Sequence, residues 1–546
     1  MKLYQTRNIM KRYIKGVFTA TVISILSVSC SDFLNEPIRG RQDLDNYYTA
    51  EDECKQQITG CYQALFFDDW WQIQKFYVCG DMCTDDEWMG NTTQDPGEYR
   101  DVAHYTGNTI NAGNCCQNFW QYRYKGILRC NIAIQRIADV NFNDVALRAR
   151  YIAEAKALRA FMYLDLVKNF GGVPLVLGLK MPSEVKGITR ATKEATYAQI
   201  EKDLLEAISD LPKRAEYASA DLGRITSGAA KGLLAKAYLY QGKYQEAELL
   251  LQDLCKRGSF GGQTPEYKLL ANFADVWSMN HNNSEESLFE VQTNSNLTYN
   301  LGERISVVTG SRDDSGWSWG LPTSNLEQAF KAAGDSIRLL YTIIKDGATL
   351  VPGDDTYSAA KPYRISADKH KSARCNMKLY IPKSKRPEPY DAPHIPLNYR
   401  LLRYADVLLM YAEVENALNN DSEAQWALNQ VRARVNLAPV MATGTQLRNA
   451  IRLERRLELA LENNRLYDLR RWKDDNGKTA IQNLMGPNGS FVQYNLNIST
   501  DKYEKTNQKE NSNKGYAFRE GRDELFPIPN SEITMSEGSI QQNPLY

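Results

Sequence analysis

Apolar residues in this chain of 546 residues recur mostly at intervals of three to four positions, the spacing of amphipathic helices. The segments with this spacing lie at about 49–66, 115–138, 146–169, 192–211, 226–256, 398–435 and 446–473. Alternation with a period of two, which would indicate strands, is short and sparse. The pattern therefore predicts a mostly α-helical protein.

Two long stretches, 258–325 and 349–396, break the helical spacing and are rich in Gly, Asn or Pro. Five prolines lie between Pro382 and Pro396, and proline lacks the backbone donor that a helix interior needs. Loops of this length commonly carry binding surfaces, so we expect the binding face to lie on them.

One segment has the residue pattern of a tetratricopeptide hairpin. In 234–247, Ala237 and Ala247 are small residues that let two helices approach closely, and Gly242 frees the turn between them. A looser copy spans 409–424. The alternative is an ordinary tight helical hairpin. If the repeats are real, stacked hairpins predict a solenoid scaffold with loops on one face.

Composition and charge exclude several classes of protein. The chain carries 66 Lys+Arg against 66 Asp+Glu, which argues against a nucleic-acid binder that relies on bulk charge. A hydrophobic share of 43% with 24% charged residues is typical of a folded protein and excludes wholesale disorder.

The N-terminus has the layout of a secretory signal peptide. Residues 1–15 contain five basic residues and no acid, and residues 16–29 form an uncharged, largely apolar run that stops at Cys30. A run this short does not span a bilayer as a helix, so a permanent anchor is the weaker interpretation. We predict a lipoprotein signal peptide at 1–29, with Cys30 lipidated and facing the cell surface from the outer membrane.

Two details qualify that prediction. Bacterial lipobox motifs usually have Leu three residues before the Cys, where this chain has Ser27, and ordinary secretion with Cys30 unmodified is the alternative. Removing residues 1–29 leaves 61 basic against 66 acidic residues, a net charge of −5. A mildly acidic mature protein points toward a neutral ligand.

The sequence offers no metal, cofactor or nucleophile motif. Nine cysteines remain after Cys30, but no second Cys or His pair follows at zinc spacing, and there is no Gly-x-Ser-x-Gly elbow or Walker loop. The acidic runs at 85–87 and 354–355 are interpreted as solvated loop acids in preference to calcium ligands. Catalysis is therefore unsupported, and we expect no cofactor.

An ordered set of motifs resembles the RagB/SusD family of outer-membrane lipoproteins. The matching segments are Ser29–Pro37, Trp120-x3-Tyr124-Lys-Gly-Ile with Asn131, 153–161, 170–174, 190–192, 223–226, 403–413, Asn429-x-x-Arg432-x-Arg434, 454–458, 465–472, 527–529 and 542–544. Any one of these motifs is weak evidence, but their order runs through nearly the whole mature chain.

The resemblance implies a mostly α fold with about four tetratricopeptide-like helix pairs and long irregular loops that carry the binding face. It implies a signal peptide at 1–29, an N-terminal region at 30–257 and a C-terminal region at 258–546. Such proteins sit as a lid on a SusC-type TonB-dependent transporter, capture an oligosaccharide or occasionally a peptide, and are not enzymes.

Most of the matched residues are interpreted as architecture. Glu454, Arg455, Glu458, Arg465, Asp468 and Arg470 are expected to form a charge network between helices. Trp120, Trp277 and Trp472 are assigned to the core.

Sugar rings stack on flat aromatic side chains, and their hydroxyl groups bind planar polar groups, so aromatics outside the helices are the candidate binding residues. The candidates are Trp70, Trp71, Asp81, Asp85 and Trp88 in one cluster and Trp317 and Trp319 in the other. The pair at 317 and 319 would turn both rings to one side of an extended loop. A surface glycoside hydrolase and a purely structural adaptor remain as alternatives of other classes.

Overall fold

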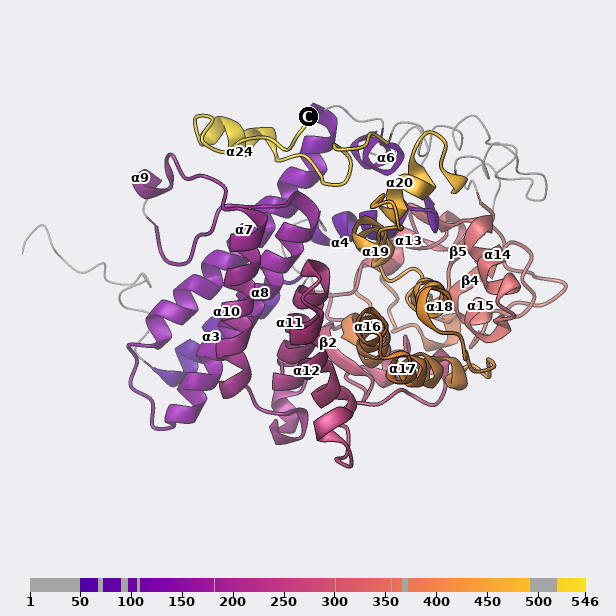
Figure 1. Cartoon of the computed structure of the whole chain (residues 1–546), viewed down its shortest axis with the longest axis horizontal. Helices are drawn as coiled ribbons and strands as arrows, with labels where there is room; N and C mark the ends of the chain where they lie inside the picture. Colours follow the sequence, from indigo (N-terminus) through magenta and orange to yellow (C-terminus); the bar gives the residue numbers. More distant parts are fainter. Residues whose placement is uncertain are drawn as a thin grey trace, which may run out of the picture. The chain divides into compact units, whose positions relative to one another are not determined.

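Eight helices of the described chain pack against one another in the order in which they occur in the sequence (Figure 1). They are α3 Glu51–Gln63, α7 Thr109–Ile137, α8 Val145–Phe170, α10 Lys193–Asp210, α11 Ser227–Gln241, α12 Tyr244–Cys255, α16 Tyr404–Ala417 and α17 Asp421–Arg434. Within this series α3 contacts α7, α8 contacts α10, α11 contacts α12, and α16 contacts α17. The prediction of a mostly α fold with about four helix pairs is confirmed.

The computed structural model describes residues 50–66, 72–89, 97–105, 109–180, 182–299, 301–354, 356–365, 372–491 and 518–546. Ala50–Tyr546 form one unit by their contacts. Three predicted site residues, Cys30, Trp70 and Trp71, lie outside the described residues. In the part that is described, no helix is long and apolar enough to cross a membrane.

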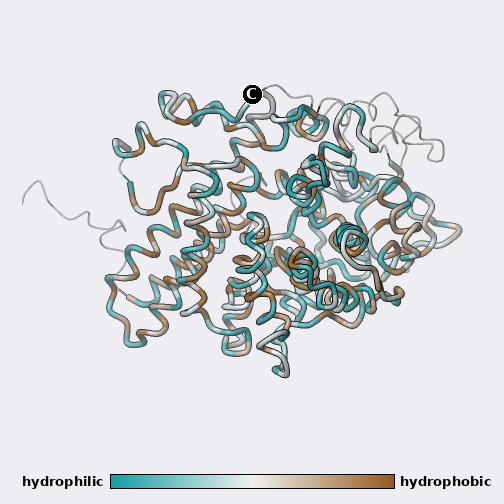
Figure 2. The backbone as a smooth tube through the Cα atoms, in the orientation of Figure 1, coloured by the Kyte–Doolittle hydropathy of each residue, from teal (hydrophilic) through white to brown (hydrophobic). Residues whose placement is uncertain are grey.

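Local sequence explains where the long helices begin and end. Helix α10 starts after Thr192, whose hydroxyl oxygen accepts a hydrogen bond from the backbone N–H of Ala195 at 3.1 Å. Helix α8 ends at Gly171, which adopts a φ of +74°. Hydrophobic and polar positions alternate in colour along the backbone in Figure 2. Helix α10 is buried on one side, whereas the second half of α8 is buried on nearly every side.

The hairpin predicted at 234–247 is present. Helix α11 ends at Gly242, which is left-handed with a φ of +74°, and α12 begins two residues later. Ala237 and Ala247 are fully buried where the two helices meet. The second predicted hairpin is formed by α16 and α17, with Asn419 in the left-handed region at the turn.

Two apolar segments were predicted as longer helices than the structure has. Residues Tyr399–Arg403 form strand β6, which pairs antiparallel with β2 (Ser287–Val291), so α16 begins only at Tyr404. The segment at 446–473 is divided into α18 (Gly444–Glu458) and α19 (Arg465–Arg471) by a turn with positive φ at Leu461 and Asn463. In both places tertiary pairing overrides the local period, which cannot separate short buried strands from helices.

Short elements make up the rest of the described chain. They are α4 Gln72–Tyr77, α5 Cys79–Met82, β1 Glu87–Met89, α6 Gly97–His104, α9 Pro182–Val185, α13 Ile305–Thr309, β3 Gly320–Pro322, α14 Ser324–Ala332, α15 Ser336–Thr342, β4 Ile343–Lys345, β5 Arg374–Asn376, α20 Ala480–Met485 and α24 Asn530–Met535. Strand β1 pairs antiparallel with β3, and β4 with β5. These pairs join the segment at 87–89 to the loop before α14, and the end of α15 to the loop at 374–376.

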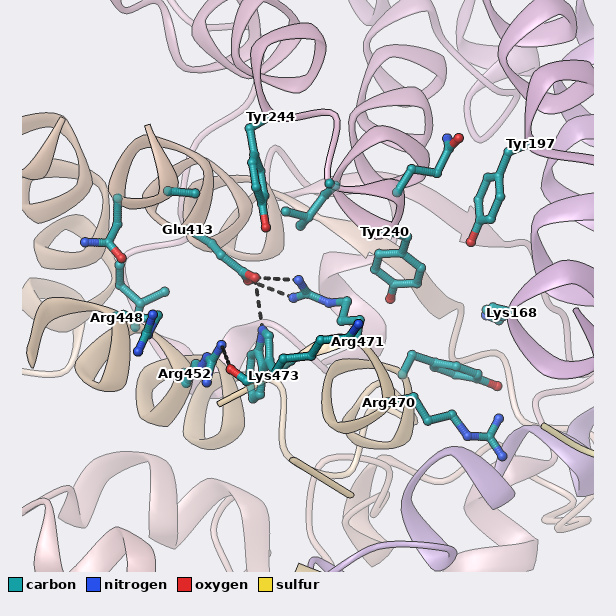
Figure 3. A pocket seen from close by; sticks show the side chains of 18 of the residues that line it. Lys168, Tyr197, Tyr240, Tyr244, Glu413, Arg448, Arg452, Arg470, Arg471 and Lys473 are labelled. Carbon is teal, nitrogen blue, oxygen red and sulfur yellow. Dashed lines mark hydrogen bonds and ion pairs between the residues drawn. The ribbon is translucent and has the colours of Figure 1, made fainter. Parts of the chain in front are cut away.

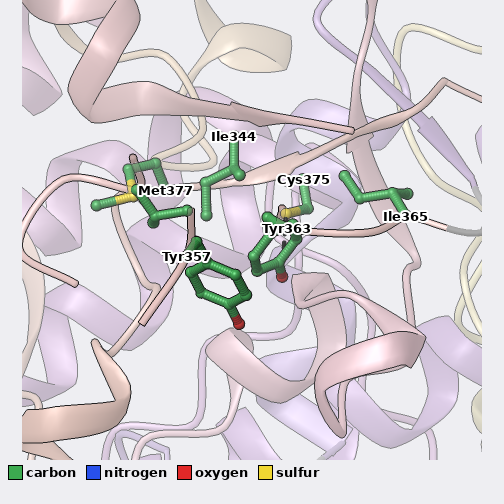
Figure 4. Close-up of a cluster of buried hydrophobic side chains, with 7 residues drawn as sticks. Ile344, Tyr357, Tyr363, Ile365, Cys375 and Met377 are labelled. Atoms are coloured by element: carbon green, nitrogen blue, oxygen red, sulfur yellow. Dashed lines mark hydrogen bonds between the residues drawn. The ribbon is translucent and has the colours of Figure 1, made fainter. Parts of the chain in front are cut away.

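The loop region has a small hydrophobic core of its own. Ile344, Tyr357, Tyr363, Cys375 and Met377 are buried together between β4, β5 and the loops that flank them (Figure 4). The other described cysteines are likewise buried free thiols. A core of this kind lets a segment without regular secondary structure hold a defined shape.

A buried charge network joins α18 to the surrounding elements. Glu458 accepts hydrogen bonds from Arg403 at 2.6 Å, from Arg338 at 2.9 Å and from Arg434. Burial alone raises the pKa of Glu458, but Arg434, Arg403 and Arg338 outweigh burial and hold that pKa well below its usual value.

Further buried ion pairs hold α18 and α19 to their neighbours. Arg455 bonds to Asp468 at 3.0 Å and to Asp406 at 2.9 Å, and Arg465 bonds to Asp85 at 3.1 Å. The predicted network is therefore present, except for Arg470, whose described hydrogen bond is to the backbone carbonyl of Asp523.

Candidate functional site

The loop after α13 carries both tryptophans of the second predicted cluster. The backbone N–H of Trp317 donates to the carbonyl of Val307 at 2.8 Å, and that of Trp319 donates to the carbonyl of Val308 at 2.9 Å. A Cβ atom at Gly316 would lie 2.2 Å from the backbone of Gly310, so only glycine fits this turn. The loop is fixed by its own backbone.

The two indole rings differ in exposure. Trp319 is 2% exposed and packs on Tyr99 with ring centroids 5.0 Å apart, whereas Trp317 is half-buried and lies 5.4 Å from Trp319. The rings are adjacent, but not because the loop is extended, since Ser318 between them has a φ of +57°. Trp319 anchors the loop and Trp317 forms its outer surface.

A basic side chain approaches the outer ring. Lys75 of α4 places its Nζ 5.4 Å from the ring centroid of Trp317. Burial lowers the pKa of Lys75, and Glu98 offsets part of that effect. The ammonium group helps to hold the indole ring in one orientation.

A shallow cavity of about 30 Å³ opens beside Gly316. On one side the Arg386 guanidinium bonds to both carboxylate oxygens of Asp314, at 3.1 and 2.5 Å. Arg386 also lies over Tyr390 and Tyr380, 4.5 and 5.7 Å from their ring centroids. The volume suits about one water molecule, so a ligand here would lie across an open surface.

Asp314, Tyr380, Arg386 and Tyr390 were missed by the sequence analysis. Two contacts hold Tyr380 in place. Its hydroxyl donates to Asp354 at 2.7 Å, and its ring centroid lies 6.0 Å from that of Tyr363 in the loop core. The signal was weak: an aromatic residue within the proline-rich stretch, and an acid a few residues before Trp317.

The described part of the first predicted cluster is buried. Trp88 is 2% exposed on β1, where it pairs with Leu321 in the strand register and packs 5.3 Å from Phe491. A ring buried to this extent offers no face to a sugar in this conformation.

Asp81 and Asp85 both bind the polypeptide itself. Asp81 accepts the backbone N–H groups of Asn463 at 2.7 Å and Arg465 at 3.2 Å, and burial raises its pKa to about 7. Burial also acts on Asp85, but Arg456 and Arg465 outweigh it and bring its pKa to about 2. The prediction of solvated loop acids at 85–87 is therefore wrong. All three residues are buried, and Asp85 and Asp86 form ion pairs with arginines of α18 and α19.

Other sequence-based assignments concern the core and metals. Trp120, Trp277 and Trp472 are 2%, 8% and 4% exposed, which confirms their assignment to the core. Within the described residues, no group of His, Cys, Asp or Glu is arranged to hold a metal ion. Among the residues that line the cavity beside Gly316, the only carboxylate is Asp314.

The sequence of the chain matches two models of one protein family. The model described as "SusD family" matches residues 276–546, and the model described as "Starch-binding associating with outer membrane" matches residues 47–239. The chain belongs to the SusD family. The matched ranges do not overlap, and together they include Trp88, the Trp317 loop and the buried charge network.

Relatives of this SusD-family chain share its length and its fold. "SusD-like protein P2" of Formosa agariphila is 25% identical, with 98% of this chain and 100% of that protein aligned. A structure named "Laminarin binding SusD-like protein" is 27% identical with a TM-score of 0.72, covering 91% of this chain and 100% of that one. Surface glycan-binding protein A of Bacteroides thetaiotaomicron, solved in complex with laminarihexaose, shares the fold with a TM-score of 0.68 at 21% identity. The alignment covers 91% of this chain and 100% of that one.

Proposed function

We propose that this SusD-family protein captures an oligosaccharide at the cell surface and delivers it to a SusC-type TonB-dependent transporter. The observation that carries the proposal is the half-exposed ring of Trp317 on a loop that its own backbone fixes. A preordered aromatic ring stacks on the apolar face of a sugar without the entropy cost of ordering a mobile side chain.

Polar groups around the cavity beside Gly316 would supply the hydrogen bonds of sugar recognition. The planar Arg386–Asp314 pair and the hydroxyl of Tyr390 lie around the cavity that shares Gly316 with the Trp317 loop. Sugar hydroxyls both donate and accept hydrogen bonds, and such groups offer both roles. The similarity to a laminarin-binding protein at 27% identity supports a β-glucan as the first ligand to test.

The proposed role is to bind the oligosaccharide without hydrolysing it. Glycoside hydrolysis uses two carboxyl groups that flank the scissile bond, and the lining of the cavity beside Gly316 contributes one, held by Arg386. Asp81, whose pKa of about 7 suits a general acid, is fully buried under α19. Neither arrangement supports catalysis at Trp317.

Calorimetric titration with laminarin, with other neutral glucans and with a peptide mixture tests capture. We expect a β-glucan to bind and to be recovered at its original length by chromatography. Binding of peptides but not of glucans would show that the ligand is a peptide and not an oligosaccharide. The appearance of shortened glucans would overturn a non-catalytic role.

Delivery and anchoring need separate tests. Lipidation at Cys30 would tether the protein to the outer membrane, and we expect metabolic labelling with a fatty acid to mark the wild type but not Cys30→Ser. We expect affinity purification from detergent-solubilised outer membranes to recover a TonB-dependent transporter. Its absence under conditions that preserve other membrane complexes would contradict delivery.

A further inference from the structure

A second cavity, with a volume of about 850 Å³, lies between the helices and is separate from the Trp317 loop. Its walls come from α8, α10, α11, α12, α16, α18 and α19. It is far larger than a single inorganic ion needs and falls in the range of about 300–1,000 Å³ that is usual for ligand pockets.

The charged side chains around this cavity are strongly unbalanced. Of the described residues that line it, seven are Lys or Arg and two are Glu. Both oxygens of Glu413 are already engaged, because Oε1 accepts from Trp472 at 3.0 Å and Oε2 accepts from Arg471 at 2.7 Å. Glu524 Oε1 accepts from Gln482 at 2.8 Å. Glu413 is neutralised by Arg471, whereas Glu524 has no ion pair among the described residues, so the lining keeps one unpaired carboxylate against several cations.

Three arginines of the lining lack a buried carboxylate partner among the described residues. Arg452 donates from Nη2 to the carbonyl oxygen of Lys473 at 3.2 Å, and Arg470 donates from Nη2 to the carbonyl oxygen of Asp523. Arg448 meets Asp475 at 3.1 Å, but that carboxylate is 84% exposed and therefore weakly held.

Electrostatics at Arg452 reflect this imbalance. Burial lowers its pKa, Glu413 offsets part of the effect, and Arg448 and Arg471 lower the pKa further. Elsewhere in the fold, arginines buried on α18 are saturated by acids, as Arg455 is by Asp406 and Asp468. Arg448, Arg452 and Arg470 are the exceptions on α18 and α19.

Figure 3 shows how the basic groups are distributed. Arg448 and Arg452 lie to one side of the view and Lys168 and Arg470 to the other, with Glu413 and Arg471 between them. Tyr244, which is half-buried, directs its hydroxyl toward the space near Glu413. Lys168 is ion-paired with Asp165 at 2.6 Å, so Arg470 supplies the cationic group at that end and Arg448 and Arg452 supply those at the other. Cationic groups at both ends suit an extended ligand that carries more than one anionic group.

We propose that this cavity is a second ligand site, which binds an oligosaccharide carrying carboxylate or sulfate groups. Guanidinium groups donate to the anionic oxygens, and Tyr244 offers an aromatic face to a sugar ring. An acidic peptide would meet the same cations, and the aromatic face of Tyr244 favours a sugar ring over it. The net charge of −5 of the mature chain does not oppose binding, because over a Debye length of about 8–10 Å the local cations dominate.

Calorimetric titration of the purified protein with trigalacturonate, a sulfated trisaccharide and uncharged galactotriose tests the proposal. We expect at least one anionic trisaccharide to bind about tenfold or more tightly than galactotriose, and raised salt to weaken it. The trisaccharide that binds identifies carboxylate or sulfate as the ligand group. Equal affinity for charged and uncharged sugars, or binding only of an acidic peptide of the same charge, would overturn the proposal.

Two variants localise the site. Arg452→Gln and Arg448→Gln should each weaken the anionic sugar about tenfold, while Arg364→Gln, which removes a 67% exposed arginine elsewhere, should change nothing. Circular dichroism checks that each variant is folded, and unchanged affinity in folded Arg452→Gln and Arg448→Gln proteins would overturn the assignment.

The two sites are separable. Trp317→Ala should leave anionic binding intact, and Arg452→Gln should leave neutral glucan binding intact. Failure of glucan binding alone would therefore refute the proposed function without touching this inference.

Discussion

The buried charge network around Glu458 and the loop that carries Trp317 contain residue types that commonly form binding sites, but they use them differently. Glu458 is fully buried and bonded to three arginines, so its charge is neutralised within the protein and cannot contact a ligand. Trp317 is held in place by the loop backbone and by Trp319, yet its ring stays half-exposed. The comparison teaches that partly exposed groups on a rigid support, rather than reactive residue types as such, mark a candidate site.

The largest expected effect comes from breaking the network. Glu458→Gln leaves Arg338, Arg403 and Arg434 without their shared carboxylate, and we expect a loss of about 3–5 kcal/mol in the free energy of unfolding. Glu206→Gln is the matched control, because its pair with Lys156 is exposed and should contribute less than about 1 kcal/mol. Similar urea midpoints for the two variants would contradict a structural role for the network.

The next effect separates the two neighbouring tryptophans. Trp319→Ala empties a buried volume against Tyr99 and should cost about 3 kcal/mol in unfolding free energy, whereas Trp317→Ala should cost less than about 1 kcal/mol. Thermal unfolding of both variants makes the measurement. Equal losses would mean that Trp317 is also part of the core.

Acid should destabilise the protein through carboxylates such as Asp85. Its folded pKa of about 2 lies below the usual 3.8, so its contribution of about 2 kcal/mol is present above pH 3.8 and is lost as the pH falls toward 2.

Asp81 should act in the opposite sense. Its pKa is raised to about 7, so the folded state keeps a proton that the unfolded state has lost, and stability falls as the pH rises from about 4 through 7. Asp81→Asn should remove that decline in urea unfolding measured between pH 4 and 8. A wild-type decline that persists in the variant would assign it to another group.

The smallest effect in energy concerns function. Trp317→Ala should weaken glucan binding about tenfold, equivalent to about 1.4 kcal/mol, because one stacking face is removed. Trp426→Ala is the matched control, since Trp426 is a half-buried tryptophan on α17, outside the loop. If calorimetry gives the two variants the same glucan affinity, Trp317 is not the binding platform.

The sequence by itself determined the helix pairs, the hairpin at Gly242 and the family, because periodicity, capping and turn residues act over a few neighbouring positions. It also determined that the loops would interrupt the helices.

Tertiary structure alone decided which chemistry-bearing residues are available. Trp88 is covered by partners near residues 321 and 491, and Asp81 is used by the backbone at 463 and 465, all hundreds of positions away. Arg455 and Arg452 lie three residues apart on one helix, yet two carboxylates hold the first, whereas the second donates to a backbone carbonyl and has no carboxylate partner among the described residues. The exposure of a side chain and the pairing of its charge depend on which residues of distant segments come into contact with it. A local sequence pattern does not contain that information.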